Sequence, residues 1–589
     1  MRRIALTMSL AAGCATHSPA PRAPGSDAAQ RLRSTGDRYW DALLSTTTLP
    51  ALNQNGVGYL GGPLYATSIG DHRFDDKLDD LSSEAQAALG GTLRGLRDEL
   101  ESIPVEGLQG EDALSYEILR EQLRDATEAD VCRMELWLVD PQNGPQTQLA
   151  QTAQGYRDTA ADRKALASRL SQAPRYFGQI AGNLRKGLAQ ELVASHANVT
   201  RVIEQLDSLL ALPAASSPFL PEKGRDEIAP VLASAVVPAL TRFRDFLREE
   251  ILPKSRPDER LGVWGLPNGA GCYAFLVRRH TGGTRTPDAL HQLGLEQLRS
   301  IEAEARKIAT DEGHDSIESF RAALEADRSE FKATREELLA FNRDLLARTM
   351  AALPRGFGGL KLLPLEVRPV ERYREASFTA GYYQPPAGEG SPGIYYVNTY
   401  QPETRPLFNI EPLLFHEAVP GHHLQGSAML DLRGLPEYRR EFGPTAYIEG
   451  WALYSERMSD EALHLYSGPK ARFGMLGYQA WRAARLVVDT GMHALRWDRE
   501  RCVKFLTDHT TLPRLEAEAE IDRYAASPGQ ALGYMIGEME IYRLRRSAEQ
   551  RLGTKFDLRG FHAAVLRHGP VSMPALAKIV DGWIAGAAN

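Results

Sequence analysis

Apolar residues recur at three- and four-residue spacing along most of the chain, with charged residues at many of the intervening positions. Residues 84–103 and 113–129 show the pattern plainly, because their apolar positions fall on one face of a helix. A longer segment adds boundary signals, with Thr286 in a capping position, Pro287 in the first turn and Gly313 beyond the last apolar position. The pattern predicts a mainly α-helical protein.

Between about residues 360 and 400 the hydrophobic period changes towards two. Val, Ile, Thr and Tyr are frequent there, and clusters of Pro and Gly interrupt the runs, as is typical of short strands and turns. We predict a small antiparallel β-sheet in this region and a return to helix after it. No linker divides the remaining chain, which favours one large domain over residues 31–589.

The N-terminus has the pattern of an export signal. Arg2 and Arg3 precede a short apolar run, residues 4–12, and small residues then lead into Cys14. A cysteine in that position is typical of the lipid-acceptor site of bacterial lipoproteins, and a plain secretory signal is the alternative. We predict that residues 1–30 are a lipoprotein-type signal and a flexible tether, and that the protein is exported to the cell envelope, facing the periplasm.

Composition narrows the possible functions. Hydrophobic residues make up 43% of the 589 residues and charged residues 25%, which is ordinary for a globular protein. The formal net charge is −7 without a basic block, which argues against a nucleic-acid partner bound through phosphates. Apart from Cys14 the cysteines are Cys132, Cys272 and Cys502, so at most one disulfide can form among them.

The stretch LLFHEAVPGHHLQ, residues 413–425, is close to the helical zinc motif H-E-x-x-H of metallopeptidases. That motif has its second histidine four residues after the first, where this chain has Pro420. In an unbroken helix His422 would lie on a different face from His416, and His423 would lie about 10 Å further along the axis. An unbroken helix therefore cannot easily bring either residue to the same metal ion as His416.

Pro420 and Gly421 predict a break in this helix. Pro420 has no N–H to donate to the carbonyl of His416, and its ring would clash with that carbonyl. Gly421 permits backbone conformations that other residues avoid. Because a looped-out turn would return His422 to about the position of an ordinary second ligand, we favour His422 and keep His423 as the alternative.

Nearby carboxylates can supply the remaining functions of a hydrolytic zinc site. Such a site has three protein ligands, an open position for water and a base that takes the proton of that water. Glu417 follows His416 directly and projects about 100° away from it on a helix, so it is the candidate base. Glu449 and Glu456, seven residues apart, share one helix face. We predict Glu449 as the third ligand and Glu456 as the residue that orients a ligand histidine.

With these residues in place, the chain resembles the bacterial family called "domain of unknown function 885". The family motif H-E-x-x-P-G-H-x-x-Q corresponds to residues 416–425, and its E-G-W-A corresponds to residues 449–452. Further similar segments lie at residues 64–76, 485–497, 523–537 and 556–569. The resemblance spans nearly the whole body of the chain and favours a single domain.

The family is similar to the helical gluzincin peptidases, in which two histidines and a glutamate bind zinc deep in a cleft between helices. The resemblance implies a large helical metallopeptidase-like fold with the small sheet next to the zinc-binding helix. It implies one Zn²⁺ per chain, with His416, His422 and Glu449 as ligands and Glu417 as base, and places the metal site at about residues 413–460.

We therefore predict a zinc-dependent hydrolase that cleaves peptide or related amide bonds. The oxyanion of such a reaction needs a donor besides the metal. Tyr534, His493 and Arg485 are the candidates, because all three lie in the family-like segments. The strand at residues 393–400 is predicted to offer an edge along which an extended peptide could lie.

Two other functions fit parts of the sequence. Two histidines and a carboxylate also suit non-haem iron enzymes, although the adjacent Glu417 favours hydrolysis. A non-catalytic, lipid-anchored binding protein with a vestigial site is the second alternative. Neither a nucleophile elbow G-x-S-x-G nor a glycine-rich phosphate loop occurs in the chain.

Overall fold

The computed structural model describes most of the chain beyond the N-terminal segment. The described residues are 27–54, 58–153, 156, 159–221, 223–370, 372, 375, 380–386, 391–430, 432, 434–441 and 443–588. Cys14 and most of the predicted signal segment lie outside them. Residues 27–30, predicted to belong to the tether, lie in helix α1, where Ala28 and Ala29 are buried.

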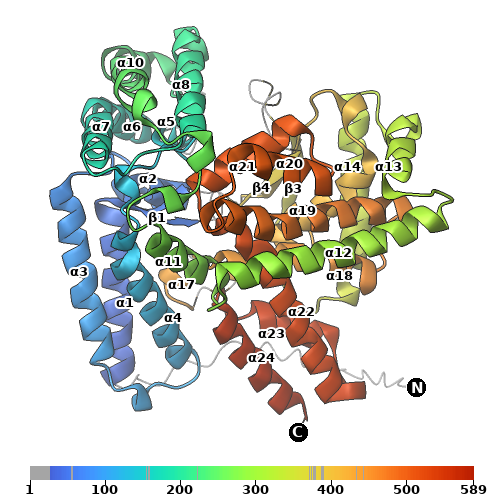
Figure 1. Ribbon diagram of the computed structural model, residues 1–589. Helices are drawn as coiled ribbons and strands as arrows, with labels where there is room; N and C mark the ends of the chain where they lie inside the picture. The colour runs from blue at the N-terminus through green and yellow to red at the C-terminus, as the bar shows by residue number, and fades with distance from the viewer. Residues whose placement is uncertain are drawn as a thin grey trace, which may run out of the picture.

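Helices make up most of the described chain, as the spacing of apolar residues predicts (Figure 1). In the first part they are α1 (Asp27–Ser45), α2 (Gly62–Ser68), α3 (Ser83–Glu101), α4 (Glu111–Glu128), α5 (Pro145–Thr152), α6 (Ala160–Ser171), α7 (Ala173–Leu188), α8 (His196–Ala211), α9 (Arg225–Val231), α10 (Val237–Phe246), α11 (Gly269–Thr281), α12 (Pro287–Asp311), α13 (Ile317–Ala326) and α14 (Arg335–Ala352). In the second part they are α15 (Ile410–Glu417), α16 (His422–Leu430), α17 (Glu437–Arg440), α18 (Thr445–Glu461), α19 (Pro469–His493), α20 (Arg499–His509), α21 (Arg514–Ala526), α22 (Gly533–Leu552), α23 (Leu558–Leu566) and α24 (Met573–Ala588).

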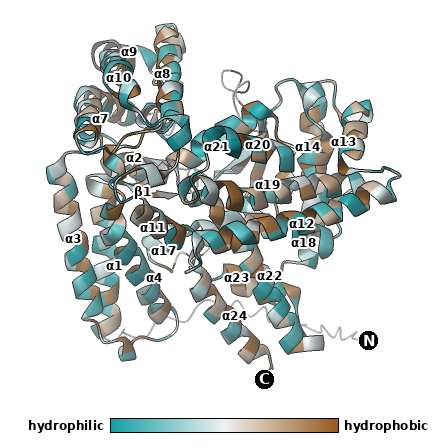
Figure 2. Ribbon diagram, in the orientation of Figure 1, coloured by the Kyte–Doolittle hydropathy of each residue, from teal (hydrophilic) through white to brown (hydrophobic). Residues whose placement is uncertain are grey.

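Local sequence signals account for several helix boundaries. Residues 84–103 form α3 and residues 113–129 form α4, within a few residues of the predicted ends. Helix α12 begins at Pro287, and the Thr286 side chain caps it by accepting the backbone N–H of Ala289. Figure 2 shows hydrophilic and hydrophobic residues interleaved along helices such as α12, as one buried and one exposed face require.

The helices pack around two main hydrophobic clusters. Helices α5 to α10, at the top left of Figure 1, enclose one cluster of their own. The larger cluster joins the N-terminal helices α1, α3 and α4 to the C-terminal helices, among which α12 and α19 run side by side through the centre. None of the helices in the described ranges is long and apolar enough to span a lipid bilayer.

The predicted sheet lies where expected but has a different topology. Strands β3 (Leu365–Pro369), β4 (Gly381–Gln384) and β5 (Gly393–Val397) are arranged in the order β3-β5-β4, with β3 parallel and β4 antiparallel to β5. The sheet is therefore mixed, and the prediction that it is antiparallel holds for one strand pair only. Every residue of β5 is buried, so β5 takes the central position, and hydrophobic period alone does not specify which strands flank it.

The sheet packs directly against the helix that carries the histidine motif. Val367 of β3 and Tyr395 of β5 share a hydrophobic cluster with Leu413 and Leu414 of α15. A separate two-stranded hairpin, β1 (Thr48–Gln54) and β2 (Gly58–Gly61), lies in the N-terminal part of the chain. The mainly α-helical fold with a small sheet beside α15 is confirmed.

One disulfide joins distant parts of the chain. Cys132, just after α4, pairs with Cys272 of α11, 140 positions later, whereas Cys502 is a free and buried cysteine. The crosslink ties the N-terminal helices to the central part of the molecule. The crosslink reduces the number of conformations open to the unfolded chain, and this stabilises the folded state.

Removing this crosslink is expected to destabilise the protein. The double variant Cys132→Ser/Cys272→Ser should lose about 2–4 kcal/mol of unfolding free energy. Thermal melting followed by circular dichroism, with and without a thiol reductant, measures the effect. The reductant should lower the Tm of the wild type and leave that of the double variant unchanged; equal melting of both proteins under all conditions would contradict the role of the disulfide.

A candidate metal centre

The helix carrying the histidine motif breaks where Pro420 and Gly421 predict. Helix α15 ends at Glu417, a turn covers residues 418–421, and α16 begins at His422. The Val419–Pro420 peptide bond in the turn is cis. The break changes the direction of the chain, so that His416 and His422 are no longer bound by the spacing of a continuous helix.

Helix α18 holds this turn in place. The carbonyl of Pro420, released from any helical hydrogen bond, accepts the indole N–H of Trp451 at 3.0 Å and the hydroxyl of Ser455 at 3.2 Å. Gly421 does not adopt the positive φ that a glycine would allow. It is needed for space, because a Cβ atom there would lie 1.9 Å from the carbonyl oxygen of His416.

The turn brings two histidines and a glutamate together. The Nε2 atoms of His416 and His422 each lie 3.4 Å from Oε2 of Glu449 on α18, and their rings are nearly perpendicular, with an interplanar angle of 87°. One ligand atom from each residue lies within 4.8 Å of the others. Zinc ligands at about 2.0–2.1 Å in tetrahedral geometry are about 3.3 Å apart, so this donor set fits such an ion.

Glycines on two helices position Glu449. Helix α18 crosses α22 at Gly450, whose Cβ would lie 2.5 Å from the Cα of Gly537, and a Cβ on Gly537 would lie 1.8 Å from the carbonyl oxygen of Ala446. The two helix backbones therefore touch next to Glu449. This explains the glycine that follows Glu449 in the E-G-W-A segment.

A second carboxylate of α18 orients His416. Nδ1 of His416 lies 2.7 Å from Oε1 of Glu456, and a guanidinium nitrogen of Arg482 lies 3.6 Å from the same oxygen. Burial lowers the pKa of His416, but the hydrogen bonds to Glu449 and Glu456 outweigh burial and raise it to about 9. A carboxylate on Nδ1 leaves Nε2 directed at Glu449, as required of a metal-binding histidine.

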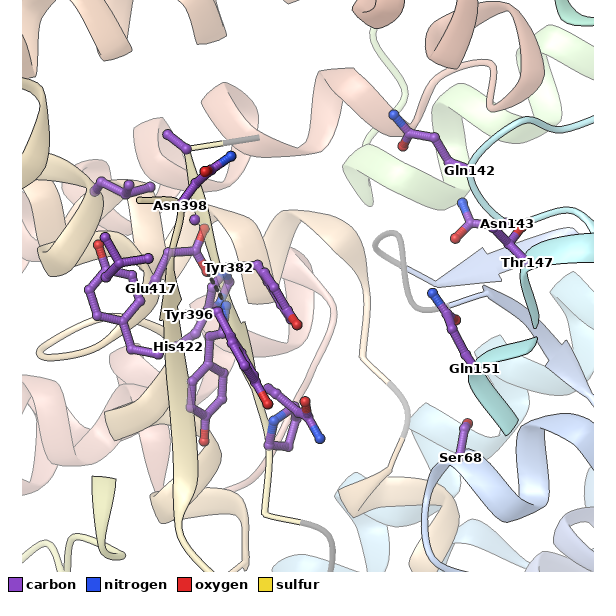
Figure 3. A pocket seen from close by; sticks show the side chains of 18 of the residues that line it. Ser68, Gln142, Asn143, Thr147, Gln151, Tyr382, Tyr396, Asn398, Glu417 and His422 are labelled. Carbon is purple, nitrogen blue, oxygen red and sulfur yellow. Dashed lines mark hydrogen bonds between the residues drawn. The ribbon is translucent and has the colours of Figure 1, made fainter. Parts of the chain in front are cut away.

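Glu417 lies beside the cluster with its own hydrogen bond. Its carboxylate accepts the backbone N–H of Tyr383, on β4, at 3.0 Å. Burial raises the pKa of Glu417, while His416 and His422 oppose this shift. Glu417 and His422 both face the cavity in Figure 3. The arrangement places a basic carboxylate next to the metal-ligand cluster and outside it.

His423, the alternative second ligand, does not belong to the cluster. It is fully buried, with Nε2 2.9 Å from the carbonyl oxygen of Leu363 and Nδ1 3.1 Å from the hydroxyl of Tyr383. Both ring nitrogens are thus engaged away from Glu449. Of the two histidines after Gly421, the structure brings only His422 to the other ligands.

Arg485 and Tyr534 share the cavity wall with the cluster. The guanidinium carbon of Arg485 on α19 lies 4.2 Å from the centre of the Tyr534 ring on α22. Burial and the Glu449 carboxylate together raise the pKa of Tyr534, which indicates that its hydroxyl is within electrostatic reach of the metal ligands. Both residues remain candidates to contact a substrate.

His493 is a correction to the sequence-based candidates. Its Nδ1 accepts the backbone N–H of Val263 at 3.2 Å, and its Nε2 lies 3.1 Å from the carbonyl oxygen of Tyr524. Burial lowers its pKa to about 3, so it stays neutral. It does not line the cavity and instead joins three segments of the core. The sequence around His493 does not distinguish a catalytic histidine from one that packs in the core.

The cluster opens into a cavity of about 3040 Å³. The far wall carries neutral polar side chains that Figure 3 shows across from Glu417 and His422, namely Ser68, Gln142, Asn143, Thr147 and Gln151. Sequence reasoning missed this wall, and the amide-rich run at residues 142–151 was the available signal. The prediction that residues 393–400 form an edge strand is wrong. Strand β5 is central in the sheet, and β4 is at the edge beside Glu417.

Comparisons with known proteins agree with the fold. Residues 63–580 match the sequence profile of a family described as "Bacterial protein of unknown function (DUF885)". A search of curated proteins finds no match. A predicted lipoprotein from Colwellia psychrerythraea is 26% identical, with a TM-score of 0.85 over 94% of this chain and 100% of that one.

Two further solved structures are more distant. A predicted lipoprotein of unknown function from Shewanella oneidensis is 19% identical, with a TM-score of 0.70 over 94% of this chain and 99% of that one, which shows a shared fold. A predicted oligoendopeptidase F from Bacillus anthracis is 12% identical over 85% of this chain and 94% of that one. Its TM-score of 0.30 is too low to support any argument.

Substitution of Gly421 tests the close contact at the turn. In Gly421→Ala the added methyl group would clash with the carbonyl of His416, so we expect about 1–3 kcal/mol of destabilisation and weaker metal binding. Gly426→Ala on α16 is the matched control, because its Cβ would meet nothing closer than the Tyr383 hydroxyl at 3.7 Å. Metal titration and melting of both variants measure the effect; wild-type behaviour of Gly421→Ala would contradict it.

The two adjacent histidines should differ sharply in metal binding. His422→Ala removes a donor of the cluster, so the protein should no longer retain a metal ion through desalting. His423→Ala should retain it and lose about 1–3 kcal/mol of stability, since the Leu363 carbonyl loses its buried partner. Elemental analysis of the two purified variants decides the assignment, and the reverse pattern would refute it.

Proposed function

The chain belongs to the bacterial DUF885 family, and from this premise we propose that it is a zinc-dependent hydrolase of peptide or related amide bonds. One observation carries the proposal: the His416–His422–Glu449 cluster, with Glu417 beside it, opens into a large polar-walled cavity. Two imidazoles and a carboxylate match the ligands of catalytic zinc sites, which keep a further position open.

Bound zinc would supply Lewis acidity and lower the pKa of a coordinated water to about 7. The residues of the chain then have separate roles. Glu417 would take the proton of the attacking water and pass it to the leaving nitrogen. Glu456 keeps His416 in position, and the Tyr534 hydroxyl is the candidate donor to the developing oxyanion.

The edge strand β4 favours a peptide as substrate. The backbone N–H of Asn398 donates to the carbonyl of Ala380. The backbone N–H and C=O groups of the even-numbered residues therefore point towards β5. The N–H of Tyr383 points the other way and reaches Glu417. Strand β4 is at the outside of the described sheet and runs beside the candidate base, where an extended peptide could bind along it.

We also propose that the protein acts in the cell envelope as one domain over residues 31–589, anchored through Cys14. The Cys132–Cys272 disulfide supports an oxidising compartment. The two most similar solved structures described above are predicted lipoproteins. A single family profile that spans residues 63–580 supports a single domain.

The ligand set by itself also suits non-haem iron. Glu417 separates the two possibilities, because an iron oxygenase has no need of a carboxylate base beside the cluster. Elemental analysis of protein purified without added metal, together with oxygen-dependent turnover, would identify an iron enzyme.

Replacement of the base tests the proposed reaction. Glu417→Gln should lower kcat for peptide hydrolysis by about 10²- to 10⁴-fold while metal content stays the same, since Glu417 is not a ligand. Glu411→Gln is the matched control on the same helix, because its amide oxygen can still accept the Ser467 N–H. A peptide-library cleavage assay with elemental analysis measures both quantities.

Two outcomes would contradict the proposed reaction. Equal cleavage by wild type and Glu417→Gln would show that Glu417 is not the base. Absence of cleavage of any peptide or amide by the zinc-loaded wild type would favour the non-catalytic binding protein.

A further inference from the structure

The carboxylate of Glu417 is held by a single hydrogen bond. It accepts the backbone N–H of Tyr383 on β4 at 3.0 Å, and it has no other hydrogen-bond partner in the described part of the chain. Glu417 is only partly buried, and both residues line the cavity. The direction of this candidate base therefore depends on where the N–H of Tyr383 points.

Tyr383 is itself joined to the helix that begins with the candidate ligand His422. Its hydroxyl lies 3.1 Å from Nδ1 of His423, whose Nε2 lies 2.9 Å from the carbonyl oxygen of Leu363. Packing around this contact is tight, because a Cβ atom on Gly393 would lie 2.7 Å from both the Tyr383 hydroxyl and Nδ1 of His423. The side chain thus connects β4 to α16, and the backbone of Tyr383 is a fixed point beside the metal centre.

Tyr383 is also a position at which β4 can pair with a peptide. In an antiparallel pair, the N–H and C=O groups of one residue point the same way and can bind the residue opposite through two hydrogen bonds. Those of Tyr383 point away from β5, and β4 is the outermost strand on that side of the described sheet. A peptide residue opposite Tyr383 would therefore donate its N–H to the Tyr383 carbonyl and direct its own carbonyl at the Tyr383 N–H.

The base and the peptide compete for this N–H. Hydrogen bonds to an ionised carboxylate are roughly twice as strong as those to a neutral carbonyl, and Glu417 must be ionised before it can accept a proton. The N–H of Tyr383 hence stays with Glu417. The carbonyl of the peptide residue opposite is left without a strand partner, at the place where the candidate base lies.

We propose that Tyr383 selects the peptide bond that is cleaved, and that the attacked carbonyl belongs to the substrate residue whose N–H binds the Tyr383 carbonyl. This inference rests on the proposed hydrolase function. Water adds to that carbonyl carbon and gives a proton to Glu417; the C–N bond then breaks, and the proton goes to the leaving nitrogen. The N–H of Tyr383 positions the base, and its C=O holds the substrate in register.

Two ester-containing peptides test the inference on the zinc-loaded wild type, because an ester removes one N–H without adding bulk. The first lacks the N–H of the residue whose carbonyl is attacked. The second lacks the N–H of the residue before it, which points away from β4 in an extended peptide. For the same cleaved bond, identified by mass spectrometry, kcat/KM should fall about 5- to 10-fold for the first and stay within about twofold for the second. A loss for the second as large as for the first, or no loss for either, would overturn the inference.

Two variants separate the N–H of Tyr383 from its side chain. Tyr383→Pro removes the N–H, which proline permits in an outer strand because this N–H does not bond to β5. Tyr383→Ala is the matched control, since it keeps the N–H and also loses the contact with His423. If the N–H positions Glu417, the proline variant should have a kcat about 10-fold or more below that of the alanine variant, with a similar KM. Equal kinetics of the two variants, or a higher KM at unchanged kcat, would contradict this role.

The results separate this inference from the proposed function. If Glu417→Gln abolishes cleavage of the all-amide peptide but the two esters are cleaved equally well, the hydrolase stands and the role of Tyr383 falls. If Glu417→Gln cleaves as fast as the wild type, the proposed reaction is wrong and the inference falls with it. Should Tyr383→Pro fail to fold, the two esters on the wild type still decide.

Discussion

The site depends on one interruption of a helix. The chain leaves helical geometry after Glu417 and resumes it at His422, and α18 holds the turn between them by donating to the carbonyl of Pro420. The same helix supplies Glu449 and Glu456. One helix thus fixes the turn, provides a ligand and orients another, which makes the local fold and the proposed chemistry inseparable.

Burial of charge is the second constraint. Glu449 and Glu456 are buried carboxylates, and such groups are tolerated only when cations or hydrogen bonds compensate for lost hydration. His416, His422 and Arg482 provide that compensation. Because the pKa of His416 is raised to about 9, it carries a proton near neutral pH when no metal is bound, so metal binding and proton release are coupled.

Sequence patterns predicted what short-range geometry determines. The period of apolar residues gave the helices, Pro420 and Gly421 gave the break, and the seven-residue spacing placed Glu449 and Glu456 on one face. The order of the strands, the packing role of His493 and the amide-bearing wall depend on contacts between distant segments. No local pattern encodes those contacts, so the position of β5 at the centre of the sheet was not predictable.

Anomalous diffraction tests the central claim most directly. Crystals grown with zinc would be measured at wavelengths just above and just below the zinc absorption edge. The account predicts one strong peak, present only above the edge, bounded by Nε2 of His416, Nε2 of His422 and the carboxylate of Glu449. No peak at this cluster, or a peak beside His423, would contradict it.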